Sequence, residues 1–469
     1  MAASVSECEM VSRIPIIVIL GATGSGKSKL AIEIAKLFNG EIVSADSMQL
    51  YKGLDVVTNK VTDEERRMVP HHMIDFLEPH VNLNVVDYRN MALRKVEEIM
   101  AKGKLPLVVG GTNYYIESLL WKVLVAMEVH KGEVGECAGE GEKCLGDGSP
   151  PGADPPPPTA PATDEDLSNE ELHRRLTQVD PERAKVLHPN NRRKILRSLQ
   201  VFEQTGRRHS DVIKEQKMSE GGGPLGGPLR FPHSCILWLR CDPEVLDKRL
   251  DDRVDDMLEN GLIDEMLDFH RRYNANRLQA QPNSEPDYTK GIFQSIGFKE
   301  FHNYLMKVEG AGVQDDKETQ KLFQEGVELM KMATRRYARR QVRWVNNRFL
   351  SQPERQVPPV YGLDASDPSK WDEVVLGPAS VIVKALMEGE KPKDIEPLPV
   401  MLRQHMNLEW DGEPKKCDIC DRWFVDPFQW KAHLKSFKHK RVEKRKMLAE
   451  AASKEVAEAK KAKTDLDAS

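Results

Sequence analysis

The sequence predicts an α/β fold with a P-loop on a parallel sheet, a helical insertion domain and a small C-terminal zinc finger. Short apolar segments alternate with helical stretches, which is the pattern of a parallel sheet. The first apolar segment runs into a glycine-rich loop, which favours a phosphate site. Near the end of the chain two cysteines precede two histidines at zinc-finger spacing.

Length and composition limit the class of protein. A chain of 469 residues is too long for one ordinary core, so we expect two or three domains. No run approaches the roughly 18 apolar residues of a membrane helix, so we expect a soluble protein without a membrane partner. Seven cysteines without a secretory signal favour a reducing compartment, where paired cysteines bind metal. The formal charge of -5 argues weakly against nucleic acid, but basic residues are concentrated locally.

Three predicted strands each end in a polar loop. In chain order these are residues 14–20 followed by loop 21–28, residues 41–45 followed by loop 46–49, and residues 105–109 followed by loop 110–112. A helix over residues 29–38 completes the first strand–loop–helix unit. Ligands of parallel sheets bind beyond the carboxyl ends of the strands, so we expect the three loops to meet at one pocket.

The rest of the chain divides by composition. Residues 128–168 are rich in Gly, Glu and Pro and are typical of disorder, and an apolar strand at 235–239 is expected to return to the sheet. The helical stretch between them is then an excursion from the core, not a separate fold. The predicted segments are 1–127 as the first part of the core, 128–168 as a disordered insertion, 169–230 as a helical insertion, 231–350 as the return strand and basic helices, 351–410 as a linker, 411–446 as the zinc finger with a basic helix, and 447–469 as a disordered tail.

The glycine-rich loop matches GxxxxGK[ST]. Its backbone N–H groups can turn inward around phosphate oxygens, Lys27 supplies a positive charge, and the Ser28 hydroxyl can ligate magnesium. The pattern does not say whose phosphate is bound. The predicted diphosphate-binding residues are Gly21, Ala22, Thr23, Gly24, Ser25, Gly26, Lys27, Ser28 and, from the third loop, Thr112.

Asp46 stands at the end of the second strand. Its carboxylate could hold magnesium or accept a proton from a nucleophile, or it could cap a helix beginning at Ser47. Thr112 follows two glycines at the end of the third strand, where its hydroxyl could approach the same phosphates or belong to an ordinary tight turn. The sequence leaves these alternatives open.

Two basic helical segments favour RNA. One carries cations beside inward-facing Ile195 and Leu199, although such a face is often merely solvated. The other, residues 331–348, holds seven cations and no acid, with Tyr337, Gln341 and Trp344 on the neighbouring stripe, which suits phosphate contacts beside a packed or base-stacking edge. The cations of the second segment include Arg335, Arg339 and Arg343.

The cysteine–histidine pattern predicts a zinc site. Cys417, Cys420, His433 and His439 have the spacing in which a hairpin supplies two thiolates and a helix two imidazoles. So short a module needs the metal to fold. The basic residues between Lys435 and Lys446 suit phosphate-backbone contacts, and a nuclear-localisation signal is the alternative interpretation.

Taken together, these motifs resemble the tRNA dimethylallyltransferase (isopentenyltransferase) family, in its eukaryotic form with a C-terminal finger. The resemblance covers about residues 14–350 and rests on motifs in the family's order, namely the P-loop, Asp46-Ser-Met-Gln-Leu-Tyr51, Gly110-Gly-Thr-Asn-Tyr-Tyr-Ile116 and Arg253-Val-Asp-Asp-Met257.

The resemblance implies transfer of the dimethylallyl group of dimethylallyl diphosphate to the exocyclic amine of the adenosine 3′-adjacent to the anticodon, with release of diphosphate. It implies Asp46, Thr23 and Arg253 as catalytic residues, Mg²⁺ at the diphosphate and Zn²⁺ in the finger. The tRNA contacts it implies, together with the basic stripe above, are Asp46, Ser47, Met48, Gln49, Thr112, Arg193, Lys194, Ile195, Leu196, Arg197, Arg335, Arg339 and Arg343.

The resemblance also suggests a monomer of the cytoplasm and mitochondrion, with the nucleus as an alternative, although Glu7 and Glu9 do not suit a mitochondrial presequence. Three rivals remain. An ATP-dependent small-molecule kinase would explain the P-loop but neither the basic helices nor the finger. A prenyltransferase acting on free AMP or ADP would not need the finger, and an RNA-binding scaffold would not need Asp46.

Overall fold

The computed structural model describes residues 14–122, 167–223, 225–280, 288, 291–311, 316–401, 415–420, 422–424 and 427–447. These fall into two compact units. The first comprises residues up to 124 and 216–403, and the second comprises 125–215 and 404 onward. The predicted insertion at 128–168 lies almost wholly outside the described residues, as does the predicted tail after 447.

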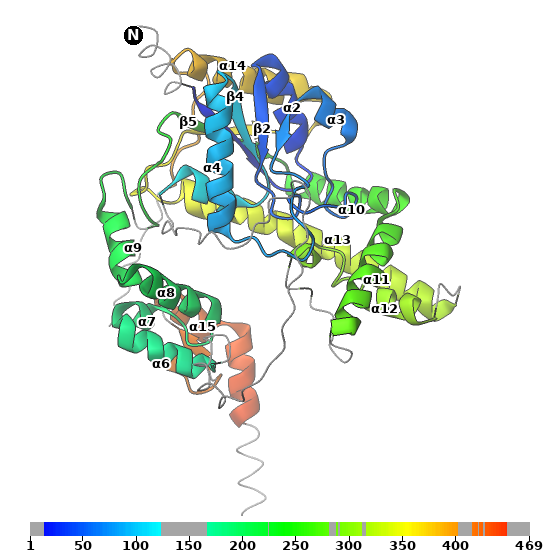
Figure 1. Cartoon of the computed structure of the whole chain (residues 1–469), viewed down its shortest axis with the longest axis vertical. Coiled ribbons are helices and arrows are strands. Elements are labelled where there is room, and N and C mark those ends of the chain that lie inside the picture. The colour runs from blue at the N-terminus through cyan, green and yellow to red at the C-terminus, as the bar shows by residue number, and fades with distance from the viewer. Residues whose placement is uncertain are drawn as a thin grey trace, which may run out of the picture. The chain divides into compact units, whose positions relative to one another are not determined.

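The first unit is built on a six-stranded sheet with the order β3-β2-β4-β1-β5-β6 (Figure 1). Every neighbouring pair is parallel, which confirms the predicted fold class. The strand at 234–240 returns beside β1, also as predicted. The strands are β1 (Ile16–Gly21), β2 (Gly40–Ser44), β3 (His71–His72), β4 (Leu105–Val109), β5 (Ser234–Arg240) and β6 (Val360–Asp364).

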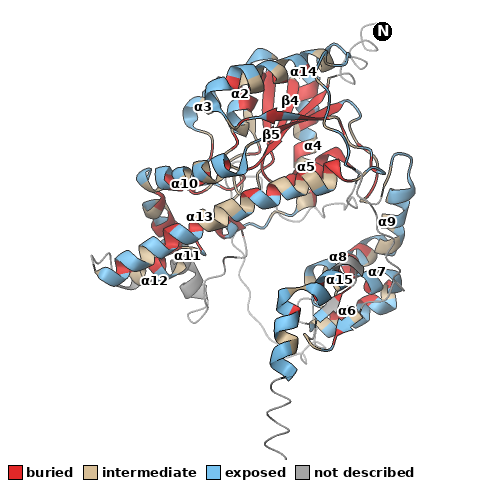
Figure 2. Cartoon of the chain, turned by 180° about the vertical axis from the view of Figure 1, so that it is seen from behind, coloured by how far each residue is buried: buried red, intermediate tan, exposed pale blue. Residues whose placement is uncertain are grey.

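Helices cover both faces of this sheet, because the apolar side chains of β1 alternate between the two faces. Ile16, Val18 and Leu20 pack with α4 (Val85–Ala101) and α5 (Asn113–Leu120), whereas Ile17 and Ile19 pack with α2 (Lys27–Leu37) and α14 (Gly377–Met387). Successive side chains of a strand point to opposite faces, so an unbroken apolar run requires a cover on each. The buried strands accordingly lie between helices in Figure 2.

A helical lobe extends the first unit. Its core is formed by α11 (Leu262–Ala280), α12 (His302–Ala311), the 3-10 helix η1 (Gly291–Gln294) and the first half of α13 (Lys317–Val345), together with part of α10 (Pro243–Glu259). The helix α13 continues from this lobe to α5, and a π-helical turn, η2 (Asn346–Leu350), follows it. The short α3 (Asp63–Met68) precedes β3.

The predicted linker at 351–410 is wrong for its middle part. Residues 360–364 form the edge strand β6, and the helix α14 packs against α2. Between them lie the 3-10 helix η3 (Pro368–Lys370) and the π-helical η4 (Asp372–Leu376). Pro358 and Pro359 immediately precede the strand, where their missing N–H groups cost no ladder hydrogen bond.

The second unit contains α6 (Asn169–Val179), α7 (Pro181–Val186), α8 (Arg192–Thr205), most of α9 (His209–Met218) and the finger elements β7 (Lys415–Cys417), β8 (Arg422–Phe424) and α15 (Pro427–Lys435). Leu172, Leu176, Ile195 and Leu199 share a small core. The helical stretch therefore has its own core, contrary to the expectation of a simple excursion. Among the described residues of the chain, no helix is long and apolar enough to cross a membrane.

Candidate functional site

The P-loop follows β1 as the sequence predicts. Gly24 and Gly26 have φ of 76° and 91°, in the left-handed region that glycine tolerates and other residues avoid. The helix α2 begins at Lys27, and no side chain caps its N-terminus within the described residues, which leaves its first N–H groups for a ligand. The Lys27 Nζ donates to the Ala22 carbonyl at 2.8 Å. The loop therefore has the geometry of a phosphate cradle.

Not every predicted loop residue faces the pocket. Thr23, Gly24, Gly26, Lys27 and Ser28 line it, whereas the buried Gly21, Ala22 and Ser25 form the turn beneath them. Their contribution is to loop shape.

Burial controls the charge of the P-loop lysine. It lowers the pKa of Lys27 to about 8, with Asp46 opposing this shift and Arg253 adding to it. Burial also lowers the pKa of Arg253, which Asp46 again raises. Two cations and one carboxylate thus meet in one poorly solvated place. The net charge of this group is positive, which suits an anionic ligand.

Asp46 lies just beyond β2. Its Oδ1 accepts the Met48 N–H at 3.0 Å, so the carboxylate closes a turn and does not cap a helix at Ser47. This contact uses one carboxylate oxygen. Burial first, and then the Asp46 charge, raise the pKa of Tyr337 above its usual value. The Tyr337 phenol therefore stays neutral and does not repel the Asp46 carboxylate.

Arg253 reaches the P-loop from α10. Its Nη1 donates to the Thr23 Oγ1 at 3.1 Å. The three residues proposed as catalytic from the resemblance, Asp46, Thr23 and Arg253, therefore line the same pocket.

A buried glutamine ties two of the loops together, and sequence reasoning did not select it as a site residue. The Oε1 of Gln341 accepts the Thr23 N–H at 2.9 Å, and its Nε2 donates to the Gly111 carbonyl at 2.9 Å. Its place on an inward stripe of α13, beside Tyr337, was the only signal in the sequence.

The third loop packs against the second. A Cβ on Gly110 would lie 2.2 Å from the Ala45 carbonyl oxygen, so only glycine allows β4 to end this close to β2. The Thr112 Oγ1 accepts the Ser47 N–H at 3.0 Å and donates to the Ser47 Oγ at 3.2 Å. Thr112 thus fixes the Asp46 loop, and its predicted contact with diphosphate stays a prediction.

The expected meeting of the three loops is confirmed by a pocket of about 560 Å³ that all three line. Residues from α10, η1 and α13 complete its wall, among them Met257, Gln294, Met330 and Arg340. The predicted tRNA contacts Ser47, Met48 and Gln49 line it as well. The volume is that of an ordinary small-molecule site.

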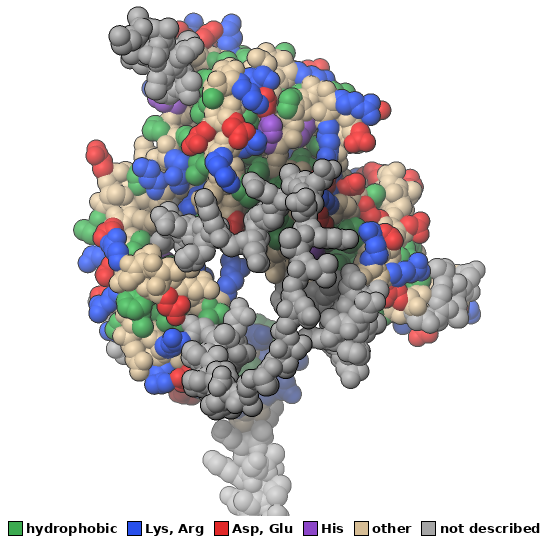
Figure 3. Space-filling model, viewed as in Figure 1, with side chains coloured by type: hydrophobic (Ala, Val, Ile, Leu, Met, Phe, Trp, Pro, Cys, Tyr) green, Lys and Arg blue, Asp and Glu red, His purple; other side chains and the backbone are tan. Residues whose placement is uncertain are grey.

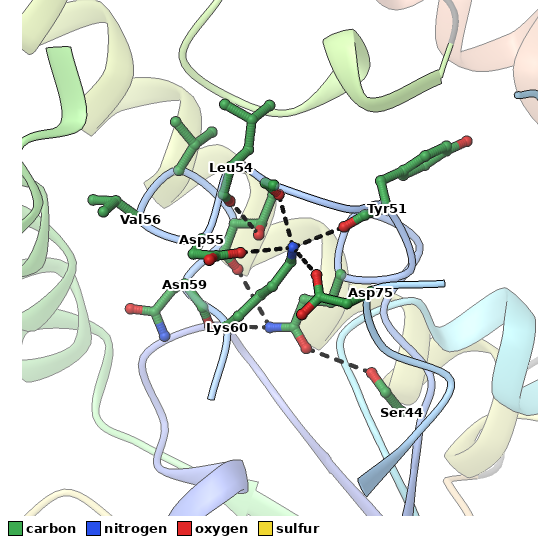
Figure 4. A network of polar contacts seen from close by, with 12 residues as sticks. Ser44, Tyr51, Leu54, Asp55, Val56, Asn59, Lys60 and Asp75 are labelled. Carbon is green, nitrogen blue, oxygen red and sulfur yellow. Dashed lines mark hydrogen bonds and ion pairs between the residues drawn. The ribbon is translucent and has the colours of Figure 1, made fainter. Parts of the chain in front are cut away.

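The wall formed by residues 57–59 is fixed by a buried lysine that the sequence did not reveal (Figure 4). Lys60 Nζ donates to the Tyr51 and Gly53 carbonyls at 2.7 Å each and also pairs with Asp55 and Asp75. Its side chain is 1% exposed.

Four residues of this loop region have positive φ although they are not glycine, namely Leu54, Asn59, Met73 and Asp75. A positive φ strains the backbone of a residue other than glycine, so it persists only where many surrounding contacts hold the backbone in place. Gln49 adds to these contacts, because its Nε2 donates to the Thr58 and Asn59 carbonyls at 3.3 and 3.1 Å.

The basic stripe of α13 is not uniformly available. Lys331, Arg335 and Arg339 pair with Asp255, Asp251 and Asp247 of α10, four residues apart on both helices. Arg336, Arg340 and Arg343 are exposed, and no ion pair is recorded for them among the described residues. The sequence could not distinguish the two sets, because the aspartates are about 80 residues away.

In the second unit, Arg193 and Lys194 are exposed on α8 and Arg197 is half-buried. Ile195 is fully buried, as the periodicity predicts, so its side chain is not available for the tRNA contact that the resemblance implies. Leu196 packs against the unit's small core. On the face shown in Figure 3, cationic and acidic side chains are interspersed over the described surface.

The four predicted zinc ligands come together. Their ligand atoms all lie within 4.8 Å of one another. The His439 Nδ1 is 3.7 Å from the Cys417 Sγ, 3.4 Å from the Cys420 Sγ and 3.1 Å from the His433 Nε2. A tetrahedral ion with bonds of about 2.0–2.3 Å separates its ligands by roughly 3.3–3.8 Å. The donor set fits zinc.

Comparison with known proteins agrees with this geometry. The family described as IPP transferase matches residues 49–348, and one described as zinc-finger double-stranded RNA-binding matches 414–440. The tRNA dimethylallyltransferase of Mus musculus is 50% identical over 434 residues, covering 91% of this chain and 85% of the mouse protein.

The human protein of the same name is 49% identical with the same coverage, and that of Saccharomyces cerevisiae is 31% identical over 91% of each chain. A crystal structure of a eukaryotic dimethylallyltransferase acting on tRNA is similar at a TM-score of 0.71 and 28% identity, covering 94% of this chain and 99% of the other. With this site and these similarities, the chain belongs to the tRNA dimethylallyltransferase family.

Proposed function

We propose that this protein transfers the dimethylallyl group of dimethylallyl diphosphate to the exocyclic amine of the adenosine 3′-adjacent to the anticodon in tRNA. The observation that supports this most is the placement of Asp46 in the same pocket as the P-loop, Lys27 and Arg253. One side of such a pocket suits a departing diphosphate and the other an amine that loses a proton. The family's named activity agrees.

In the reaction, the amine nitrogen forms a bond to the allylic carbon while the bond from that carbon to the diphosphate oxygen breaks. Negative charge then develops on the diphosphate. Lys27, Arg253 and the N–H groups at the start of α2 lie where they stabilise that charge. The hydroxyl of Thr23, held by Arg253, adds a donor.

The proton lost by the amine passes to the Asp46 carboxylate. Since Oδ1 accepts from Met48, the other oxygen remains for the substrate. The Ser47–Thr112 contacts hold the turn that carries this carboxylate. Asp46 acts as the general base in this proposal.

Magnesium fits the pocket. The exposed Ser28 hydroxyl lines it, and Asp46 offers a carboxylate nearby. Ser28 and the donor's phosphate oxygens would hold the ion, which supplies Lewis-acid stabilisation to the leaving group when bound.

The tRNA contacts are proposed on both units. Ser47, Met48 and Gln49 lie at the pocket, and a base must leave its stack to enter it. Arg193, Lys194 and Arg197 of α8 present cations to the phosphate backbone. On α13 we assign phosphate contacts to Arg343, as predicted, and to Arg336 and Arg340, whereas Arg335 and Arg339 must first be released from Asp251 and Asp247.

The test is donor and acceptor selectivity. The full-length, zinc-loaded protein is incubated with either dimethylallyl diphosphate or ATP, each with tRNA, with an anticodon stem-loop or with AMP. We expect diphosphate release only with dimethylallyl diphosphate and RNA, and the modified adenosine is located by mass analysis of the nucleosides. Turnover of ATP without RNA would indicate a kinase, and prenylation of AMP would indicate a free-nucleotide enzyme.

A further inference from the structure

A tryptophan from the C-terminal part of the first unit packs against the P-loop, although the sequence predicted only a linker there. Trp371 lies between η3 and η4 and is 7% exposed. It belongs to the core cluster that also contains α2 and α14. The strand β6 and the helix α14 on either side of it are fixed to the sheet, so its position does not depend on the P-loop alone.

The indole covers one stripe of α2. A Cβ on Gly26 would lie 2.8 Å from the ring's Cη2, so the ring edge contacts the backbone of that glycine. The Lys29 Nζ is 4.5 Å from the ring centroid, and the indole Nε1 donates to the Glu33 Oε2 at 2.7 Å. Residues 26, 29 and 33 follow the three- and four-residue spacing of one helix face.

The turn that the indole covers is one that lines the pocket. Gly26 immediately precedes Lys27 and Ser28, and Lys29 also lines the pocket. Gly26 has a φ of 91° in the left-handed region, and as a glycine it has no side chain to restrict its backbone. The ring edge limits this freedom at Gly26, and the cation–π contact holds the ammonium of Lys29, itself a pocket-lining residue, beside the indole.

We propose that Trp371 is a positioning residue for the donor's diphosphate. It acts through Gly26, which it holds in the cradle conformation, and through Lys29, which it orients. The inference rests on the proposed function only in naming the bound group as a diphosphate. Through Trp371, the segment 360–387 therefore contributes to the shape of the P-loop.

The experiment compares Trp371→Ala with Val375→Ala in the full-length, zinc-loaded protein. Val375 is fully buried in the same cluster, one helical turn away, and it is not among the nearest neighbours of a Cβ placed on Gly21, Gly24 or Gly26. For each variant, the affinity for inorganic diphosphate is measured by calorimetry, KM for the donor and kcat by steady-state kinetics, and tRNA affinity by filter binding.

We expect Trp371→Ala to weaken diphosphate binding and raise the donor KM by about tenfold, since misplaced binding groups lose affinity steeply, while tRNA affinity is unchanged. Val375→Ala should lower the melting temperature without changing diphosphate affinity. Equal diphosphate affinity in Trp371→Ala and the unmodified protein would overturn the proposal, as would an equal loss in Val375→Ala.

Two milder variants keep the test decisive if Trp371→Ala does not fold. Trp371→Phe retains a ring under Gly26 and Lys29 but loses the bond to Glu33, and Glu33→Leu removes the same bond while leaving the indole in place. Both should weaken diphosphate binding by a smaller, similar factor, and no change in either would refute the role. If the unmodified protein bound no diphosphate, the proposed function itself would fail, which is a distinct result.

Discussion

At the scale of single residues, the site depends on charges placed where water is scarce. Burial holds the pKa of Lys27 near 8, so at neutral pH its ammonium is charged but incompletely solvated. The oxygens of a bound diphosphate would interact strongly with this ammonium, because little water screens the two charges. Diphosphate binding therefore favours the protonated form of Lys27.

This linkage predicts the pH dependence of donor binding. Below pH 8 Lys27 is already protonated and affinity is flat, whereas above pH 8 binding requires proton uptake, so the dissociation constant rises toward about tenfold per pH unit. The donor's phosphate oxygens are ionised by then, since phosphate groups titrate at about pH 6. Calorimetry from pH 6.5 to 9.5 measures the slope. Lys27→Arg, which stays charged, should abolish it, and a slope that persists in this variant would assign the titration to another group.

Asp46 permits a separate test of chemistry. Asp46→Asn keeps an oxygen that can accept the Met48 N–H, so the turn should survive while the proton acceptor is lost. We expect the single-turnover rate at saturating enzyme to fall by about 10²–10⁴-fold, with tRNA affinity retained. A large loss of tRNA binding with little loss of rate would contradict the assignment of Asp46 as the base.

At the scale of elements, the pairing of α10 with α13 decides which cations of α13 are neutralised by acids. The aspartates of α10 neutralise one row of α13 cations, at partly exposed positions where each pair stabilises the fold by at most about 1 kcal/mol. The neighbouring row is exposed and charged. The basic stripe of α13 is therefore divided into a paired row and an exposed row by α10, which lies about 80 residues earlier in the chain.

Substitution of the two rows should therefore differ. Arg336→Ala, Arg340→Ala and Arg343→Ala are each expected to weaken tRNA binding and to reduce the slope of log K against log salt by about one. Arg335→Ala and Arg339→Ala should change the slope less. The double variant Asp247→Asn, Asp251→Asn frees two cations and should tighten binding. Salt titration measures these slopes. Equal slopes for both rows would show that the ion pairs between α10 and α13 break when RNA binds.

The loop between β2 and α3 makes a prediction about stability. Lys60→Met leaves Asp75 and two carbonyls without their buried donor, and we expect a cost of about 3 kcal/mol in the free energy of unfolding. Lys52→Met is the matched control, because its pair with Glu78 is half-exposed and should contribute much less to stability. Urea denaturation measures both, and similar costs would show that Lys60 is not a buried anchor.

At the scale of the whole molecule, the pocket and the proposed RNA contacts of α8 and the finger lie in separate compact units. The pocket is lined entirely by residues of the first unit, whereas α8 and the finger belong to the second. Binding and turnover should therefore be separable by changes in the second unit.

Zinc removal tests this separation. Chelation, or Cys417→Ser, should unfold the finger, because so small a core needs its metal. We expect weaker tRNA binding, by about tenfold or more through loss of several phosphate contacts, and an unchanged single-turnover rate at saturating enzyme. Circular dichroism and metal analysis verify the loss of the finger alone. A fall in the saturated rate equal to the fall in affinity would contradict independent units.

The sequence by itself determined the parallel sheet, the P-loop, the position of Asp46 and the zinc ligands. These features are local: an apolar run, a glycine pattern or a ligand spacing is complete within a few dozen residues, and the rule that ligands bind at strand ends does the rest. The same logic failed at residues 351–410, where a short strand after prolines has too little apolar pattern to be distinguished from a linker.

Only the tertiary structure decided which residues support that site. Gln341 reaches Thr23 across 318 positions, Trp371 covers α2 from more than 300 residues away, and the acids that neutralise Arg335 and Arg339 lie on another helix. Hydrogen bonds and ion pairs between distant segments follow from how helices pack on the sheet, and packing depends on the shapes of all side chains together. The spacing of residues along the sequence does not reveal this packing.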